Sequence, residues 1–80
     1  MTAYVVISDS IINGRQSHGL HGVYLSEENA RAVAVSTIIH ETVRCSRKIN
    51  TDDIIMDGPE FSYKNDIIDI CVSCIEQEVK

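Results

Sequence analysis

The sequence predicts a small α+β domain, residues 1–80, with the order strand, strand, helix, strand. Short runs of β-branched and aromatic residues lie at 3–8 and 23–25. A capped segment with helical periodicity follows at 27–44. The final segment, 65–79, is again dense in isoleucine and valine. These observations predict a ββαβ domain in which one helix packs on a three-stranded antiparallel sheet.

The first strand carries apolar residues on both of its faces. We expect Val5 and Ile7 to face the core, because this leaves the Tyr4 hydroxyl able to reach water. The connection from Asp9 to Gly22 is long and contains several glycines, and its Asn-Gly pair favours a tight turn. Because loops of this length in small domains are usually functional or disordered, this segment is the first candidate for function.

The helix is predicted over Glu27–Arg44. Ser26 can cap it, and Glu27 and Glu28 place negative charge at the positive end of the helix dipole. Its apolar arc is wider than one sheet requires. The excess apolar surface therefore meets either another subunit or the C-terminal segment of the same chain.

The C-terminal third has one clear turn signal, at Asp57–Pro59. The short apolar patch before it, residues 54–56, fits either a strand stub or a tethering contact. Residues 65–79 fit a helix or a strand, and the density of β-branched residues favours the strand. The strand would present one continuous apolar face, formed by Ile68, Ile70, Val72 and Cys74.

One helix leaves the other face of such a sheet uncovered. We expect Tyr4, Tyr24 and Ile75 on that open face, where they would form an exposed apolar patch. Patches of this kind usually mark interfaces. The sequence therefore predicts a homo-oligomer, most simply a dimer.

The net charge of −5 is unevenly distributed. Residues 1–50 carry a net charge of +1 and residues 51–80 carry −6. The acidic third argues against direct nucleic-acid binding, and it is either a solvated surface or a site for a basic protein. The candidate partner-binding residues crowd one predicted connection: Asp52, Asp53, Asp57 and Glu60.

The N-terminal half resembles a class of small bacteriophage proteins. The resemblance rests on Tyr4-Val5-Val6-Ile7, a polar loop, and Gly22-Val23-Tyr24-Leu25-Ser26-Glu27-Glu28-Asn29-Ala30 leading into a helix. It covers residues 3–45 and not the acidic third. The resemblance implies an accessory protein of phage or mobile-element origin, and it brings no catalytic residues.

The glycine-rich connection also offers a ligand site. Its backbone N–H groups and the fork of Arg15 could hold a phosphate, with Ser17, His18 and His21 as further candidate ligand-binding residues. The spacing matches neither the P-loop nor the dinucleotide fingerprint. The alternative is a mobile polar loop.

Two histidines and two cysteines form the ligand set of a structural zinc site. However, Cys71 and Cys74 would point to opposite faces of a strand. We therefore expect no metal and no cofactor. No nucleophile has a partner base at helical or strand spacing, so the sequence predicts a protein that is not an enzyme.

The predicted function is that of a phage accessory protein that binds and modulates a host protein, in host takeover or anti-defence. The alternative is an oligomeric binder that sequesters a phosphate-bearing nucleotide through Arg15–His21. The odd number of cysteines, three, indicates reduced thiols. With no signal peptide and no apolar run of membrane length, we expect a cytoplasmic protein.

Overall fold

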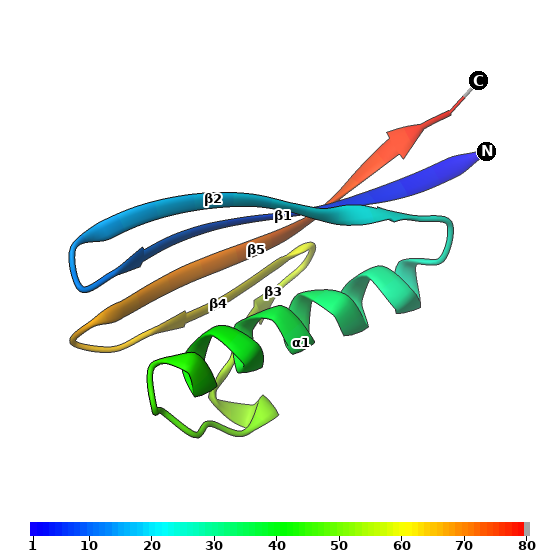
Figure 1. The fold of residues 1–80 in the computed structure, drawn as a ribbon. Helices are drawn as coiled ribbons and strands as arrows, with labels where there is room; N and C mark the ends of the chain where they lie inside the picture. The colour runs from blue at the N-terminus through cyan, green and yellow to red at the C-terminus, as the bar shows by residue number, and fades with distance from the viewer. Residues whose placement is uncertain (80) are drawn as a thin grey trace.

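The computed structural model describes residues 1–79, which form a five-stranded antiparallel sheet with one helix along one face (Figure 1). The order of strands across the sheet is β2-β1-β5-β4-β3. The elements are β1 (Thr2–Ile12), β2 (Arg15–Tyr24), α1 (Glu27–Arg44), a 3₁₀ turn (Thr51–Asp53), β3 (Ile55–Asp57), β4 (Glu60–Lys64) and β5 (Ile68–Glu78). Among residues 1–79, no helix combines the length and the apolar character needed to cross a membrane.

The chain is α+β, but the predicted ββαβ arrangement with a three-stranded sheet is wrong. The order is ββαβββ, and two hairpins account for the difference. In the segment expected to be a loop, residues 9–12 continue β1 and residues 15–22 belong to β2, which pairs with β1. The segment expected to be a connection, residues 50–64, contains β3 and β4.

The first hairpin closes on a two-residue turn. Asn13 and Gly14 have φ angles of 53° and 79°, the left-handed conformations that a type I′ turn requires. Ile12 pairs with Arg15 directly across the turn. The prediction of a turn at this pair is confirmed. The residues after it are polar and resemble a loop in the sequence, because β2 is an edge strand that is exposed along most of its length.

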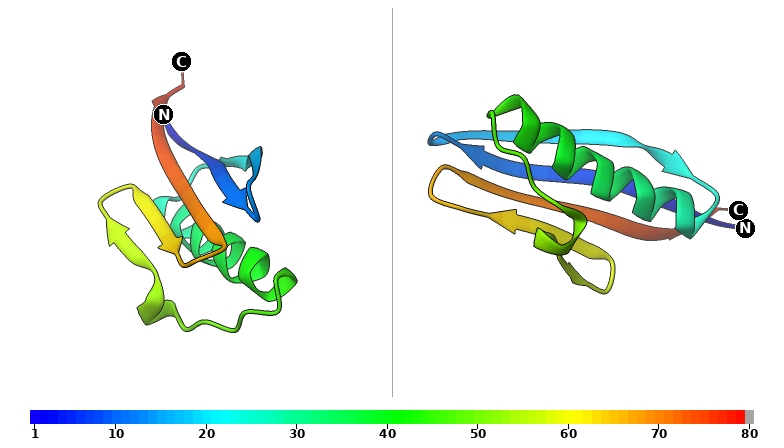
Figure 2. Two further views of the ribbon diagram at one scale, coloured as in Figure 1. Left: turned by 90° about the vertical axis from the view of Figure 1, so that its left-hand side faces the viewer. Right: turned by 90° about the horizontal axis from the view of Figure 1, so that it is seen from below.

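The second hairpin is held against the helix by an arginine. Arg31 donates from Nη1 to the carbonyl of Gly58 at 2.8 Å, and its guanidinium carbon lies 4.7 Å from the centre of the Phe61 ring. Phe61 itself is buried on β4. With these contacts, β4 lies beside β5, β3 forms the outer edge, and the hairpin lies under the N-terminal half of α1 (Figures 1 and 2).

The strand prediction for the C-terminal segment is confirmed. In β5 the predicted apolar face is buried, and its members are Ile68, Ile70, Val72 and Cys74. The helix prediction is also confirmed, since α1 has the expected bounds and Ser26 Oγ accepts from the backbone N–H of Asn29 at 3.3 Å.

The core lies between α1 and the middle of the sheet. The helix contributes Ala30, Ala34 and Ile38, all fully buried, and the sheet side includes Val6 and Phe61. The second apolar stripe of the helix is partly covered by the same chain. Val35 and Ile39, for example, pack against the core.

The predicted orientation of β1 is wrong, because Val6 rather than Val5 or Ile7 faces the core. Both faces of β1 are apolar, so alternation alone could not choose between them. The choice comes from β5, since Val6 pairs with Cys74 on its buried face. It follows that Tyr4 lies on the helix side, where it packs against the core, as Tyr24 does. Those two residues are therefore not on the open face, whereas Ile75 is.

We predict that Ile38→Ala lowers the free energy of unfolding by about 2–5 kcal/mol, because it leaves a cavity at the centre of the core. The matched control is Val43→Ala on the same helix, where the side chain is 57% exposed and the change should stay within about 0.5 kcal/mol. Urea denaturation followed by circular dichroism measures both. Equal losses in the two variants would contradict the placement of the core.

Candidate functional site: a polar cleft between the β1–β2 hairpin and α1

The helix-facing side of the sheet changes from apolar to polar across neighbouring strands. On β5 the inward residues include Ile70 and Val72, which are buried. Their partners on β1 are Ser10 and Ser8, and Ser10 is in turn paired with Ser17 on β2. Positions that would complete a hydrophobic core therefore carry hydroxyl groups.

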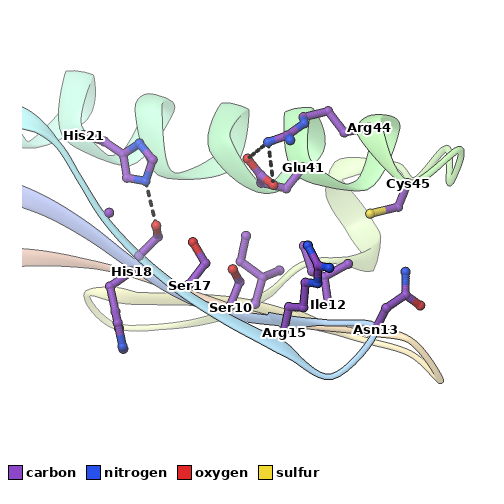
Figure 3. A pocket seen from close by; sticks show the side chains of 13 residues that line it. Ser10, Ile12, Asn13, Arg15, Ser17, His18, His21, Glu41, Arg44 and Cys45 are labelled. Carbon is purple, nitrogen blue, oxygen red and sulfur yellow. Dashed lines mark hydrogen bonds and ion pairs between the residues drawn. The ribbon is translucent and has the colours of Figure 1, made fainter.

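These serines border a cleft of about 510 Å³ between the β1–β2 hairpin and the C-terminal part of α1 (Figure 3). We call it the hairpin–helix cleft. The hairpin contributes Ser8, Ser10, Ile12, Asn13, Arg15, Ser17, His18, Gly19 and His21, and the helix end contributes Glu41, Arg44 and Cys45. Ile70 lies beneath them on β5.

A β-bulge turns His21 towards the helix. The pairing of β1 with β2 shifts between Val6 and Ile7, because Val6 pairs with Gly22 and Ile7 with Leu20, leaving His21 as an extra residue. The φ of Gly22 is +136°, a conformation that side chains rarely allow. The Tyr24 hydroxyl donates to the carbonyl of His21 at 3.1 Å and so holds the bulge.

His21 Nε2 lies 2.7 Å from Ser8 Oγ across the top of the cleft (Figure 3). Gly19 makes this contact possible. A Cβ at that position would lie 3.2 Å from His21 Nε2 and 3.3 Å from Ser8 Oγ, closer than most such contacts. Among residues 1–79, Ser8 is the single side chain that hydrogen-bonds to the imidazole, so no carboxylate orients it.

The charges in the cleft are mainly positive. Arg44 Nη1 lies 3.2 and 3.4 Å from the two carboxylate oxygens of Glu41. Arg15 approaches from the hairpin, and it forms no ion pair within the part of the chain that the structure describes. The cleft thus combines two guanidinium groups with one carboxylate, which favours a small anion.

All four predicted ligand-binding residues line the cleft: Arg15, Ser17, His18 and His21. His18 differs from the other three in the orientation of its side chain. Its side chain points away from the cleft (Figure 3), and its Nδ1 contacts a carboxylate oxygen of Asp9 on the opposite face of the sheet. The reason is alternation, because His18 is one residue from Ser17 along a regular strand.

Sequence reasoning missed the other half of the cleft. The sequence did contain a signal for Ser8 and Ser10, because they follow Val6 on the same face of the strand and interrupt its apolar pattern. No sequence signal indicated that Glu41 and Arg44 line the cleft, because a charged pair near a helix end usually faces solvent.

Cys71 and Cys74 lie on opposite faces of β5, as the strand requires. Burial raises the pKa of both thiols, and the Glu60 carboxylate adds to the effect at Cys71. The thiols therefore remain protonated at neutral pH and are poor metal ligands. Within residues 1–79, no group of three histidine, cysteine, aspartate or glutamate side chains could hold a metal ion.

The four acidic residues proposed to bind a partner lie in two places. Asp52 and Asp53 belong to the 3₁₀ turn, where Asp53 Oδ2 accepts from the backbone N–H of Asn50 at 2.8 Å. Asp57 and Glu60 face each other at the turn between β3 and β4. All four are exposed; Asp52 and Asp53 precede β3, whereas Asp57 ends β3 and Glu60 begins β4.

Comparison with protein-family models, curated proteins and solved structures finds no significant match. The resemblance to small phage proteins therefore stays a prediction.

We predict that Gly22→Ala lowers the free energy of unfolding by about 1–3 kcal/mol, because the φ of +136° strains any side chain. The added Cβ would also lie 2.9 Å from the Tyr24 hydroxyl, which holds the bulge. Urea denaturation measures the loss, and the ring signals of His21 in an NMR spectrum report whether the bulge has moved.

The control on the same strand is Gln16→Ala, since that side chain is exposed and lies outside both the cleft and the buried core. A Gly22→Ala variant that is as stable as the parent, with unchanged His21 signals, would contradict this account of the bulge.

Proposed function

We propose that this protein binds a small anionic ligand, such as a phosphate-bearing nucleotide, in the hairpin–helix cleft. The observation that carries the proposal is the row of serines on the helix-facing side of the sheet. Ser8, Ser10 and Ser17 occupy positions where apolar side chains would let the helix close onto the hairpin. Departures from core patterning of this kind are expected at functional sites.

The cleft offers the groups that a phosphate needs. A guanidinium can bind two phosphate oxygens at once, and Arg15 is available for this because it makes no ion pair among residues 1–79. Serine hydroxyls can donate further hydrogen bonds. The volume, about 510 Å³, falls within the usual range for small-molecule sites.

Binding without catalysis fits the arrangement of Ser8 and His21. A serine activated by a histidine usually needs a third group to hold the imidazole, and the described residues supply none. We therefore assign the pair a binding role. A hydroxyl and an imidazole side by side can each donate to or accept from a ligand.

We predict that the protein binds nucleoside monophosphates and that Arg15→Ala weakens this binding by at least about tenfold, since a charge-assisted contact contributes on the order of 1.5–3 kcal/mol. Isothermal titration calorimetry measures the affinity. The matched control is Arg47→Ala, because Arg47 is exposed beyond the end of α1 and does not line the cleft.

Failure of the parent protein to bind any nucleotide or inorganic phosphate would overturn the proposal. Equal losses in Arg15→Ala and Arg47→Ala would point to general attraction between charges and not to the cleft.

As a second candidate function, we propose that the acidic residues near β3 bind a basic protein of a host cell, as an accessory protein of a phage would. The supporting observation is that Asp52, Asp57 and Glu60 are exposed and form no ion pair in the region that the structure describes. Unpaired carboxylates of this kind can steer a basic surface towards them.

We predict that a double variant, Asp52→Asn with Asp57→Asn, binds at most about half as much of the partner recovered from a bacterial lysate as the parent protein does. Higher salt should weaken the same association. Asp53 is left unchanged because it caps the 3₁₀ turn. The matched control is Asp66→Asn with Asp69→Asn at the β4–β5 end of the sheet. Equal retention by both double variants would contradict this second function.

A further inference from the structure

The face of the sheet opposite α1 carries a continuous set of apolar side chains. No element among residues 1–79 covers this face (Figures 1 and 2). Its apolar residues are neighbours across three strands, because Val5 pairs with both Val23 and Ile75 and Ile7 pairs with Leu20. We call these five residues the open-face patch.

The exposure of this patch is large for a chain of this size. Leu20, Val23 and Ile75 are 69%, 61% and 44% exposed, although each sits in a regular strand. The sequence therefore places apolar residues on both faces of β1 and supplies a helix for one face only. Apolar patches of this kind mark surfaces that become buried in an assembly.

We propose that the open-face patch is the contact between two copies of this chain. The argument rests on charge. None of the five residues is charged, and neither are their neighbours Ala3 and Ser73, while the chain as a whole carries −5. A partner attracted by charge would dock on the acidic residues near β3. A charge-free patch is complementary to an identical patch. In a dimer with two-fold symmetry, the same patch of the second copy lies against the first.

The surroundings of the patch support an interface between two sheets. The contact between Asp9 and His18 borders it on one side, and Glu60, which pairs with Ser73, borders it on another. An apolar centre with a polar rim is the usual organisation of a protein interface. Two such sheets can stack face to face at about 10 Å, with their side chains interdigitating.

Pairing through the free edge of β2 is the other way in which two copies could join. The bulge at His21 and Gly22 interrupts this edge. Bulges of this kind protect edge strands from pairing, so the structure favours contact through the face. In a face-to-face dimer the helices lie on the outside, and the hairpin–helix cleft of each copy remains open to ligand.

The test compares Val23→Lys with Val43→Lys. The two valines are similarly exposed, at 61% and 57%, but Val43 lies on α1, away from the open face. Sedimentation equilibrium over about a hundredfold range of concentration measures the association constant. We expect the parent and Val43→Lys to pass from one chain to two, and Val23→Lys to associate at least about tenfold more weakly.

A parent protein that stays monomeric at the highest concentration would overturn the proposal, as would a Val23→Lys variant that dimerises like the parent. A loss confined to Val43→Lys would place the interface on the helix and would overturn it too. Leu20→Glu, at the most exposed position of the patch, repeats the test should Val23→Lys fail to fold by circular dichroism. Nucleotide binding by the monomeric variant is measured separately. The proposed dimer and the proposed ligand site can therefore fail independently of each other.

Discussion

The pairing of β1 with β5 is the constraint on which the rest of this structure depends. It runs without interruption from Thr2 opposite Glu78 to Ile12 opposite Ile68, and it joins two segments from opposite ends of the chain at the centre of the sheet. Because side chains alternate along a strand, this single register decides which residues of β1 face the helix. The buried core, the polar cleft and the open-face patch all follow from it.

Local signals in the sequence predicted the elements whose causes are local. Ser26 and the two glutamates after it mark the start of the helix, and the Asn13–Gly14 pair marks a turn. The β-branched residues of the last segment indicate a strand. The sequence revealed only the end of β2, at Val23 and Tyr24, because the glycines and polar residues before them resemble a loop until β1 is available as a partner. Tertiary pairing outweighs the intrinsic preference of these residues.

In the candidate site, too, residues with local signals were predicted, and residues brought in by tertiary structure were not. Arg15, Ser17, His18 and His21 were found because they lie together in one short segment, and alternation along the strand then turns the His18 side chain away from the cleft. Arg44 joins the site only because the helix ends above the hairpin, a relation that no local pattern expresses. The cleft therefore depends partly on the polar residues of the hairpin segment and partly on where the helix crosses the sheet.

The bulge in β2 also determines how the length of this segment can vary during evolution. Between Gly22 and the helix cap at Ser26, the insertion of one residue directly after Gly22 would exchange the faces of Val23 and Tyr24. A tyrosine would then leave the core, and a valine would replace it beneath the helix. Changes of two residues preserve the alternation, whereas single insertions and deletions reverse it. We therefore expect homologous sequences to differ in length at the Asn13–Gly14 turn and not between the bulge and the helix.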